Sequence, residues 1–139
     1  MPAPEDTAEQ IAALLDGLVR RQRRASKADL DVTHGQLRVL RTLDNADRAL
    51  RLSELANQLG IVPRSATTVV DDLEAAGLVA RKPDPDDRRA TLVNLTPAGT
   101  KLLTTIRRHR RDAMVSLVER LEPSEQAELL RLLNRLSDE

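Results

Sequence analysis

The segment Leu78–Thr96, LVARKPDPDDRRATLVNLT, concentrates opposed charges in a chain of 139 residues whose formal net charge is zero. Three aspartates and four basic residues stand between two short apolar runs. An arginine at the tip of such a turn could pair with a phosphate or a base edge, and a neighbouring carboxylate could hold an arginine in a fixed orientation. We therefore predict that Asp84 and Asp87 brace the turn, with Asp87 holding Arg89 while Arg88 projects.

A second group of candidate residues follows Pro63, in the segment PRSATT. Proline is favoured as the first residue of a helix, so the polar residues after it should lie in the first turns. In a helix-turn-helix these turns enter the major groove of duplex DNA. The residues predicted to face the groove are Arg64, Ser65, Thr67 and Thr68. Arg64 is the predicted base reader, because a guanidinium can pair with guanine through two hydrogen bonds. The alternative is that Ser65 and Thr67 only satisfy backbone groups while Arg64 meets a phosphate.

The middle of the chain is predicted to form the helix-turn-helix that positions these residues. Thr33 and Gln36 are predicted to form a capping box at the start of the helix that precedes the helix-turn-helix. The helix SELANQLG stops at Gly60, and only two residues separate Gly60 from Pro63, where the next helix starts. That helix is expected to end at Gly77. Its predicted inward face consists of Ala66, Val69, Val70, Leu73 and Ala76.

Two short runs, Leu78–Lys82 and Thr91–Leu95, flank the charged turn and predict a two-stranded hairpin, or wing. A helix-turn-helix followed by a hairpin can lay its second helix in the major groove while the hairpin tip reaches an adjacent minor groove. Arg88 and Arg89 therefore complete the predicted DNA-binding set. The predicted fold class is mainly α with a small β-hairpin wing, a winged helix-turn-helix flanked by long dimerisation helices.

Amphipathic helices are predicted at both ends of the chain. Apolar residues recur at helical spacing from Ile11, and this helix is expected to run on through RRQRRASKADL; Thr96 starts a second long helix and Pro123 a last one. Their apolar faces are longer than a small core can cover, which predicts a homodimer. The expected parts are an N-terminal dimerisation helix, a DNA-binding region and C-terminal dimerisation helices, over residues 1–32, 33–98 and 99–139, in one compact domain overall.

The composition excludes several classes of function. Phe, Tyr and Trp are absent, which removes stacking platforms for single-stranded nucleic acid and aromatic cages for cations. No apolar run approaches the length that a bilayer requires, and the acidic start does not resemble a secretory signal, so we expect a cytoplasmic protein with no membrane partner. No motif indicates an enzyme or a cofactor. His34 and His109 stand on different predicted helices, so no metal site is predicted.

Taken in order, the motifs of this chain resemble those of the MarR-type winged-helix transcription regulators. They are TxxQLxVLxxL at Thr33–Leu43, LSELANQLG at Leu52–Gly60, P-x-S-x-T at Pro63–Thr67, VVDDLEAAGLVAR at Val69–Arg81, D-x-x-D-x-R from Asp84, and LTPAG at Leu95–Gly99. The chain departs from the family pattern in three places. Val62 replaces a common capping serine or threonine, Thr68 stands where arginine is frequent, and Asp86 stands where the wing is often basic.

The resemblance implies a cytoplasmic homodimer, joined through its terminal helices, that binds pseudo-palindromic operators on double-stranded DNA. It also implies a repressor that is released by a small aromatic or anionic effector. His34 and Arg38 are the candidate ligand-binding residues, because they lie near the expected junction of the dimerisation and DNA-binding regions; the alternative is that His34 only belongs to a polar helix start. Cysteine is absent, so oxidant sensing through a thiol is excluded.

A different function remains as the alternative. A winged helix can also serve as a module that binds another protein without specific DNA binding, and a neutral chain is compatible with that use. Arg64 and the charged wing favour DNA.

Overall fold

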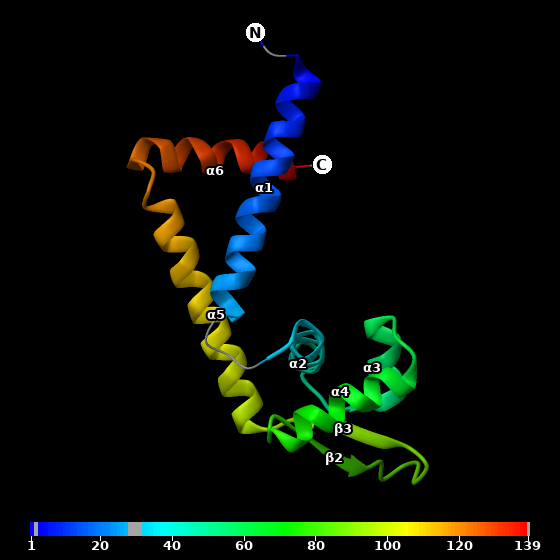
Figure 1. Ribbon diagram of the computed structural model, residues 1–139. Helices are drawn as coiled ribbons and strands as arrows, with labels where there is room; N and C mark the ends of the chain where they lie inside the picture. Colours follow the sequence, from blue (N-terminus) through cyan, green and yellow to red (C-terminus); the bar gives the residue numbers. More distant parts are fainter. Residues whose placement is uncertain (2, 28–31, 139) are drawn as a thin grey trace. The chain divides into compact units, whose positions relative to one another are not determined.

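The computed structural model describes residues 1, 3–27 and 32–138. The helices, labelled in Figure 1, are α1 (Pro4–Lys27), α2 (His34–Ala46), α3 (Leu52–Leu59), α4 (Pro63–Ala75), α5 (Pro97–Val118) and α6 (Pro123–Ser137). The strands are β1 (Leu50–Arg51), β2 (Val79–Pro83) and β3 (Thr91–Leu95). The chain divides into two compact units, and α5 contributes to both. We name them the winged-helix unit, Asp29–Arg107, and the terminal-helix unit, Met1–Ala28 with Arg108–Glu139.

Local sequence signals set the helix ends in the winged-helix unit. The Gln36 backbone N–H donates to Thr33 Oγ1 at 3.1 Å, and the Thr33 backbone N–H donates to Gln36 Oε1 at 3.0 Å. The predicted capping box before α2 is therefore present. Gly60 ends α3 with a φ of 68°, a left-handed conformation that favours glycine, and Pro63 is the first residue of α4. These contacts produce the tight turn of the helix-turn-helix.

The inward face of α4 matches the prediction except at its end. Ala66, Val70 and Leu73 are buried, and Val69 is half-buried. Ala76 was predicted to face inward, but this prediction is wrong because Ala76 is exposed. The physical reason is that α4 ends at Ala75, so Ala76 is the C-cap and no longer follows the helical repeat.

The wing belongs to a three-stranded antiparallel sheet with the order β1-β3-β2. The hairpin of β2 and β3 pairs Val79 with Leu95 and Pro83 with Thr91, close to the two predicted runs. Strand β1 adds to the other edge of β3 through Leu50 and Arg51. Strand β1 was not predicted, because two residues are too short to show the alternation that identifies a strand. The mainly α fold with a small hairpin wing is confirmed.

One hydrophobic core holds the winged-helix unit together. Its buried members are Leu37, Val39, Leu40, Leu43, Leu50, Leu55, Leu59, Val70, Leu73, Val79, Val93, Leu103 and Ile106. They come from α2, α3, α4, all three strands and the first half of α5. The core therefore fixes α4 and the root of the wing on the same unit.

The terminal-helix unit keeps many apolar side chains exposed. They are Ile11, Leu14, Leu15, Leu18 and Val19 of α1, Met114 and Val115 of α5, and Leu129, Leu130, Leu132, Leu133 and Leu136 of α6. Helix α1 begins at Pro4, earlier than the predicted periodicity, and the predicted continuation through Ala28–Leu30 lies outside the described residues. Within the described ranges, no helix is long and apolar enough to cross a membrane.

Gly99 provides a direct test of packing where α5 begins. Gly99 is buried, and a Cβ added to it would lie 2.2 Å from the Leu78 carbonyl oxygen. That oxygen accepts the Thr96 backbone N–H at 3.1 Å, so it has little freedom to move. We expect Gly99→Ala to lower the free energy of unfolding by about 1–3 kcal/mol in chemical denaturation.

Gly35→Ala is the matched control for Gly99→Ala. Gly35 also lies in the first turn of a helix of the winged-helix unit, but the nearest atom to an added Cβ is Thr33 Oγ1 at 4.0 Å. This variant should be as stable as the wild type or slightly more stable. Equal stability of the two variants would contradict the close packing at Gly99.

Candidate nucleic-acid interface

The first turn of α4 presents polar side chains to solvent. Arg64, Ser65 and Thr68 are exposed, while Thr67 is half-buried. Val62 occupies the N-cap position without a side-chain hydrogen bond, and its own side chain is exposed. The predicted groove-facing residues therefore lie on or beside one accessible face, as expected of a recognition helix.

The two threonines of this turn satisfy backbone groups of their own helix. Thr67 Oγ1 donates to the Pro63 carbonyl at 3.0 Å, and Thr68 Oγ1 donates to the Arg64 carbonyl at 3.2 Å. Each hydroxyl proton is thereby used, but each threonine oxygen can still accept a hydrogen bond and each methyl group can meet an apolar surface. Arg64 and Ser65 are the better placed donors in this turn.

Asp84 anchors the wing to the body of the winged-helix unit. It is the one charged side chain that is buried among the described residues, with 5% of its surface exposed. Its Oδ2 accepts Arg51 Nε at 2.8 Å, and its Oδ1 accepts the Asp86 backbone N–H at 2.9 Å. The hydrogen bond from Asp86 and then the Arg51 side chain hold the pKa of Asp84 below its ordinary value, against the opposing effect of desolvation.

Asp87 acts on the backbone of the wing loop. Its Oδ1 accepts the Arg89 backbone N–H at 3.0 Å, and its carbonyl oxygen accepts the Ala90 backbone N–H at 2.9 Å. The predicted pairing was with the Arg89 side chain, but the contact in the structure is with the backbone amide. An aspartate reaches the amide two residues on without strain, as in an Asx turn. Arg88 and Arg89 both remain exposed at the wing tip.

Arg81 joins the wing to α4 and was not predicted as a site residue. Its Nη2 lies 2.5 Å from Asp71 Oδ1 and its Nη1 lies 3.1 Å from Glu74 Oε1. Arg81 lies seven residues after Glu74 and ten after Asp71. These spacings predict no ion pair, because the side chains meet only once the turn between α4 and β2 brings them together.

Arg51 was missed in the same way. It lies 33 residues before its partner Asp84, so their pairing depends on the antiparallel contact of β1 with β3. The Arg51 backbone N–H donates to Glu54 Oε1 at 3.1 Å, which caps the start of α3. Glu54 also pairs with Arg48 at 3.0 Å. The Arg48 side chain and the Arg51 N–H together hold the pKa of Glu54 below its ordinary value.

The wing tip and the start of α4 share one cleft. A cleft of about 360 Å³ is lined by Arg51, Leu52, Ser53, Pro63, Asp87, Arg89, Ala90 and Thr91. It brings the predicted residues Asp87 and Arg89 next to the first residue of the recognition helix. Arg88 and Lys82 line a second cleft of about 300 Å³ on the wing, and Ala90 and Thr91 line both clefts. The two wing arginines therefore line different clefts.

His34 and Arg38 belong to α2, and neither is among the residues that line the two clefts beside the wing. His34 is the exposed first residue of α2, and Arg38 Nη2 donates to the Leu59 carbonyl at the end of α3 at 2.9 Å. No cluster of histidine and carboxylate side chains with the geometry of a metal site occurs among the residues that the structure describes.

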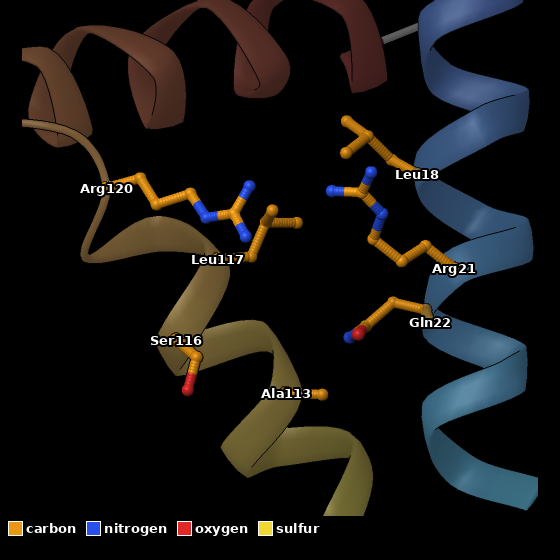
Figure 2. Close-up of a pocket in the computed structure, with 7 residues that line it drawn as sticks. All are labelled: Leu18, Arg21, Gln22, Ala113, Ser116, Leu117 and Arg120. Carbon is orange, nitrogen blue, oxygen red and sulfur yellow. The ribbon is translucent and has the colours of Figure 1, made fainter. Parts of the chain in front are cut away.

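A cavity in the terminal-helix unit lies between α1 and α5 (Figure 2). It measures about 230 Å³, and it is lined by Leu18, Arg21, Gln22, Ala113, Ser116, Leu117 and Arg120. Figure 2 shows the guanidinium groups of Arg21 and Arg120 reaching into the space between the two helices, beside the leucines. Gln22, which also lines the cavity, donates from Nε2 to the Arg110 carbonyl at 3.2 Å.

Comparison with known proteins identifies the class to which this fold and surface belong. A family model described as the MarR family matches residues 32–91. The uncharacterized HTH-type transcriptional regulator ML2140 of Mycobacterium leprae is 33% identical over 111 residues, which cover 80% of this chain and 76% of that protein. The crystal structure of RV1404 from Mycobacterium tuberculosis matches with a TM-score of 0.78 and 28% identity, covering 99% of this chain and 94% of that chain.

A structure with DNA is also similar. A cysteine-to-serine mutant of MarR from E. coli, complexed with operator DNA, matches with a TM-score of 0.62 and 25% identity over 97% of this chain and 99% of that chain. The fold therefore defines a winged helix-turn-helix regulator of transcription. The chain belongs to the MarR family, a family of transcription regulators that bind DNA.

The buried carboxylate of Asp84 should make the stability of the folded chain depend on pH. Because the pKa of Asp84 is lower in the folded chain than in the unfolded chain, its contribution to stability is fully present above the unfolded pKa, ordinarily about 3.9. That contribution is lost as the pH falls through the lowered pKa. We expect Asp84→Asn to be less stable than the wild type at neutral pH, and the difference to shrink in strongly acidic solution.

Denaturant unfolding of both proteins across the acidic range would measure this difference. Asp86→Asn, which removes an exposed carboxylate from the same loop, controls for the general loss of a negative charge. A difference between wild type and Asp84→Asn that stays constant to the lowest pH would contradict the role of the ionised carboxylate.

Proposed function

We propose that this chain is a homodimeric, cytoplasmic repressor that binds a pseudo-palindromic DNA operator through α4 and the wing and is released by a small ligand. The observation that carries the proposal is the exposed first turn of α4 beside a wing whose backbone is held by Asp84 and Asp87. A recognition helix and a hairpin tip in this order can meet a major groove and the adjacent minor groove.

The arginines divide between the two grooves in this proposal. Arg64, exposed at the start of α4, is the base reader, with Ser65, Thr67 and Thr68 beside it. Arg88 and Arg89, exposed at the wing tip, meet the minor groove or the phosphates. Asp84 and Asp87 act indirectly, because they hold the backbone from which these arginines project.

A second copy of the chain is the proposed cover for the terminal helices. The leucines of α6 from Leu129 to Leu136 are all at least 40% exposed in a single chain. Leu18 of α1 and Leu117 of α5 add an apolar part to the cavity in Figure 2. Apolar patches of this extent normally mark an interface, and a two-fold dimer would present two recognition helices to two half-sites.

The proposed effector is a small aromatic or anionic molecule, with His34 and Arg38 as its candidate contacts. These residues are four apart on α2, so they share one face of the helix. Arg38 already holds the Leu59 carbonyl at the end of α3. An anion that drew Arg38 away would release the last turn of α3, which leads directly into the recognition helix. This coupling would explain how a ligand could weaken DNA binding.

Salt-dependent binding to duplex DNA separates this proposal from a winged helix that binds only protein. For a DNA-binding protein, the logarithm of the affinity falls linearly with the logarithm of the salt concentration, by about 0.9 per phosphate contact. Selection of bound duplexes from a random pool would then identify the site. Two half-sites about one helical turn apart support a two-fold dimer. Salt-insensitive or absent binding would instead favour the protein-binding module.

Replacing Arg64 and replacing Arg88 should have different effects on DNA binding. We expect Arg64→Ala to cost about 1–3 kcal/mol on the selected duplex and much less on a scrambled duplex, because it removes a base contact. Arg88→Ala should weaken both duplexes by similar factors and lower the salt slope by about one unit, because it removes a phosphate contact. Binding isotherms on both duplexes at two salt concentrations measure the difference. If Arg64→Ala weakened both duplexes equally, its assignment as the base reader would be wrong.

Dimerisation through α6 can be tested at one of its exposed leucines. Sedimentation of the wild type should give about twice the mass of one chain at micromolar concentration. Leu133→Asp should weaken the dimer by several kcal/mol, because it would bury an unpaired charge. Asn134→Asp, which places the same charge on the next residue, is the matched control and should weaken it less. A wild-type protein that sediments as a folded monomer at this concentration would refute the proposed dimer.

A further inference from the structure

Arg81, on β2, is fastened to α4 by its guanidinium and by its backbone. Nη2 donates to Asp71 Oδ1 at 2.5 Å, and Nη1 donates to Glu74 Oε1 at 3.1 Å. Nη2 also reaches the Thr67 carbonyl at 3.4 Å. The Arg81 backbone N–H donates to the second oxygen of Glu74 at 2.9 Å. Only 22% of the Arg81 side chain remains exposed, so this cation is largely withdrawn from solvent.

Asp71 and Glu74 would otherwise oppose the binding of α4 to DNA. Their side chains are 59% and 43% exposed, and they lie on the helix that is proposed to enter the major groove. A carboxylate close to a polyanion repels it unless a cation lies beside it. Arg81 is that cation for both acids. It also joins α4 to the first strand of the wing, so one side chain ties together the two elements that are proposed to contact DNA.

We propose that Arg81 is a positioning residue that sets the sequence discrimination of the DNA-binding surface. It neutralises Asp71 and Glu74 and fixes α4 against the wing, so that both elements meet one duplex in a single register. This inference rests on the proposed DNA-binding function. It also gives the basic residues of the wing different roles. Arg81 pairs with acids of α4, whereas the exposed Lys82 and Arg88 can contact phosphates.

The test compares three variants with the wild type. Arg81→Met keeps an apolar stem and removes the charge. The double variant Asp71→Asn/Glu74→Gln keeps the shape of the two acids and removes their charge, and a triple variant combines all three changes. Each protein is titrated with the duplex that the wild type selects from a random pool and with a scrambled duplex, at several salt concentrations. Circular dichroism establishes that each variant is folded.

The proposal predicts rescue. Arg81→Met should bind the selected duplex roughly 10- to 100-fold more weakly, because it leaves two carboxylates unpaired at the interface. The triple variant should recover most of the affinity, to within about fivefold of the wild type, and should keep its salt slope, because it has no unpaired acids and has lost no phosphate contact. It should still discriminate less between the two duplexes than the wild type does, because α4 is no longer tied to the wing. The double variant should bind the scrambled duplex more tightly and discriminate less between the duplexes, because it frees the Arg81 cation.

Two results would overturn the proposal. The first is a triple variant that stays as weak as Arg81→Met, with a salt slope about one unit lower than that of the wild type, because Arg81 would then contact a phosphate itself. The second is wild-type affinity in Arg81→Met. If Arg81→Met alone does not fold, the affinity of the triple variant still tests the proposal. If the wild type bound no duplex in a salt-sensitive way, the proposed function would fail and this inference with it.

Discussion

Arginines from one element hold carboxylates from another throughout the winged-helix unit, and the geometry of α4 and the wing depends on these pairs. Arg51 on β1 holds Asp84, which holds the loop of the wing. Arg81 on β2 holds Asp71 and Glu74 of α4. A hairpin of two five-residue strands is marginally stable by itself. Pairing with the rest of the unit therefore gives the wing and the recognition helix fixed positions.

The same pairs bear on how a chain of zero net charge could still bind an anionic partner. Net charge describes the whole chain, whereas a duplex meets the local distribution of charge. Several acids near the wing are occupied by internal partners, either an arginine or a backbone amide. Arg64, Lys82 and Arg88 are exposed around them. The opposed charges of the wing thus serve two purposes, since the acids shape the loop and the basic residues are left to meet an anionic partner.

Interactions within a few residues could be predicted from the sequence, and interactions between distant elements could not. The capping box at Thr33 and the break at Gly60 act over one helical turn, so residue types and spacing identify them. The partner of Arg51 is 33 residues away, and no spacing rule indicates it before the sheet is known. The contact of Asp87 with the Arg89 backbone N–H could have been predicted from the spacing. A backbone amide two residues after an aspartate competes with a flexible guanidinium for the same carboxylate.

Hydrogen exchange in the presence of duplex DNA tests most directly that α4 and the wing act as one DNA-binding surface. Amide hydrogen exchange of the wild-type chain would be measured alone and with a random duplex at low salt. The segments in which the duplex slows exchange would then be mapped along the chain. We expect hydrogen exchange to slow in both of the peptides that cover residues 62–68 and 84–90, with little change in α6. Slowing that is confined to other parts of the chain, or that reaches only one of these two segments, would contradict it.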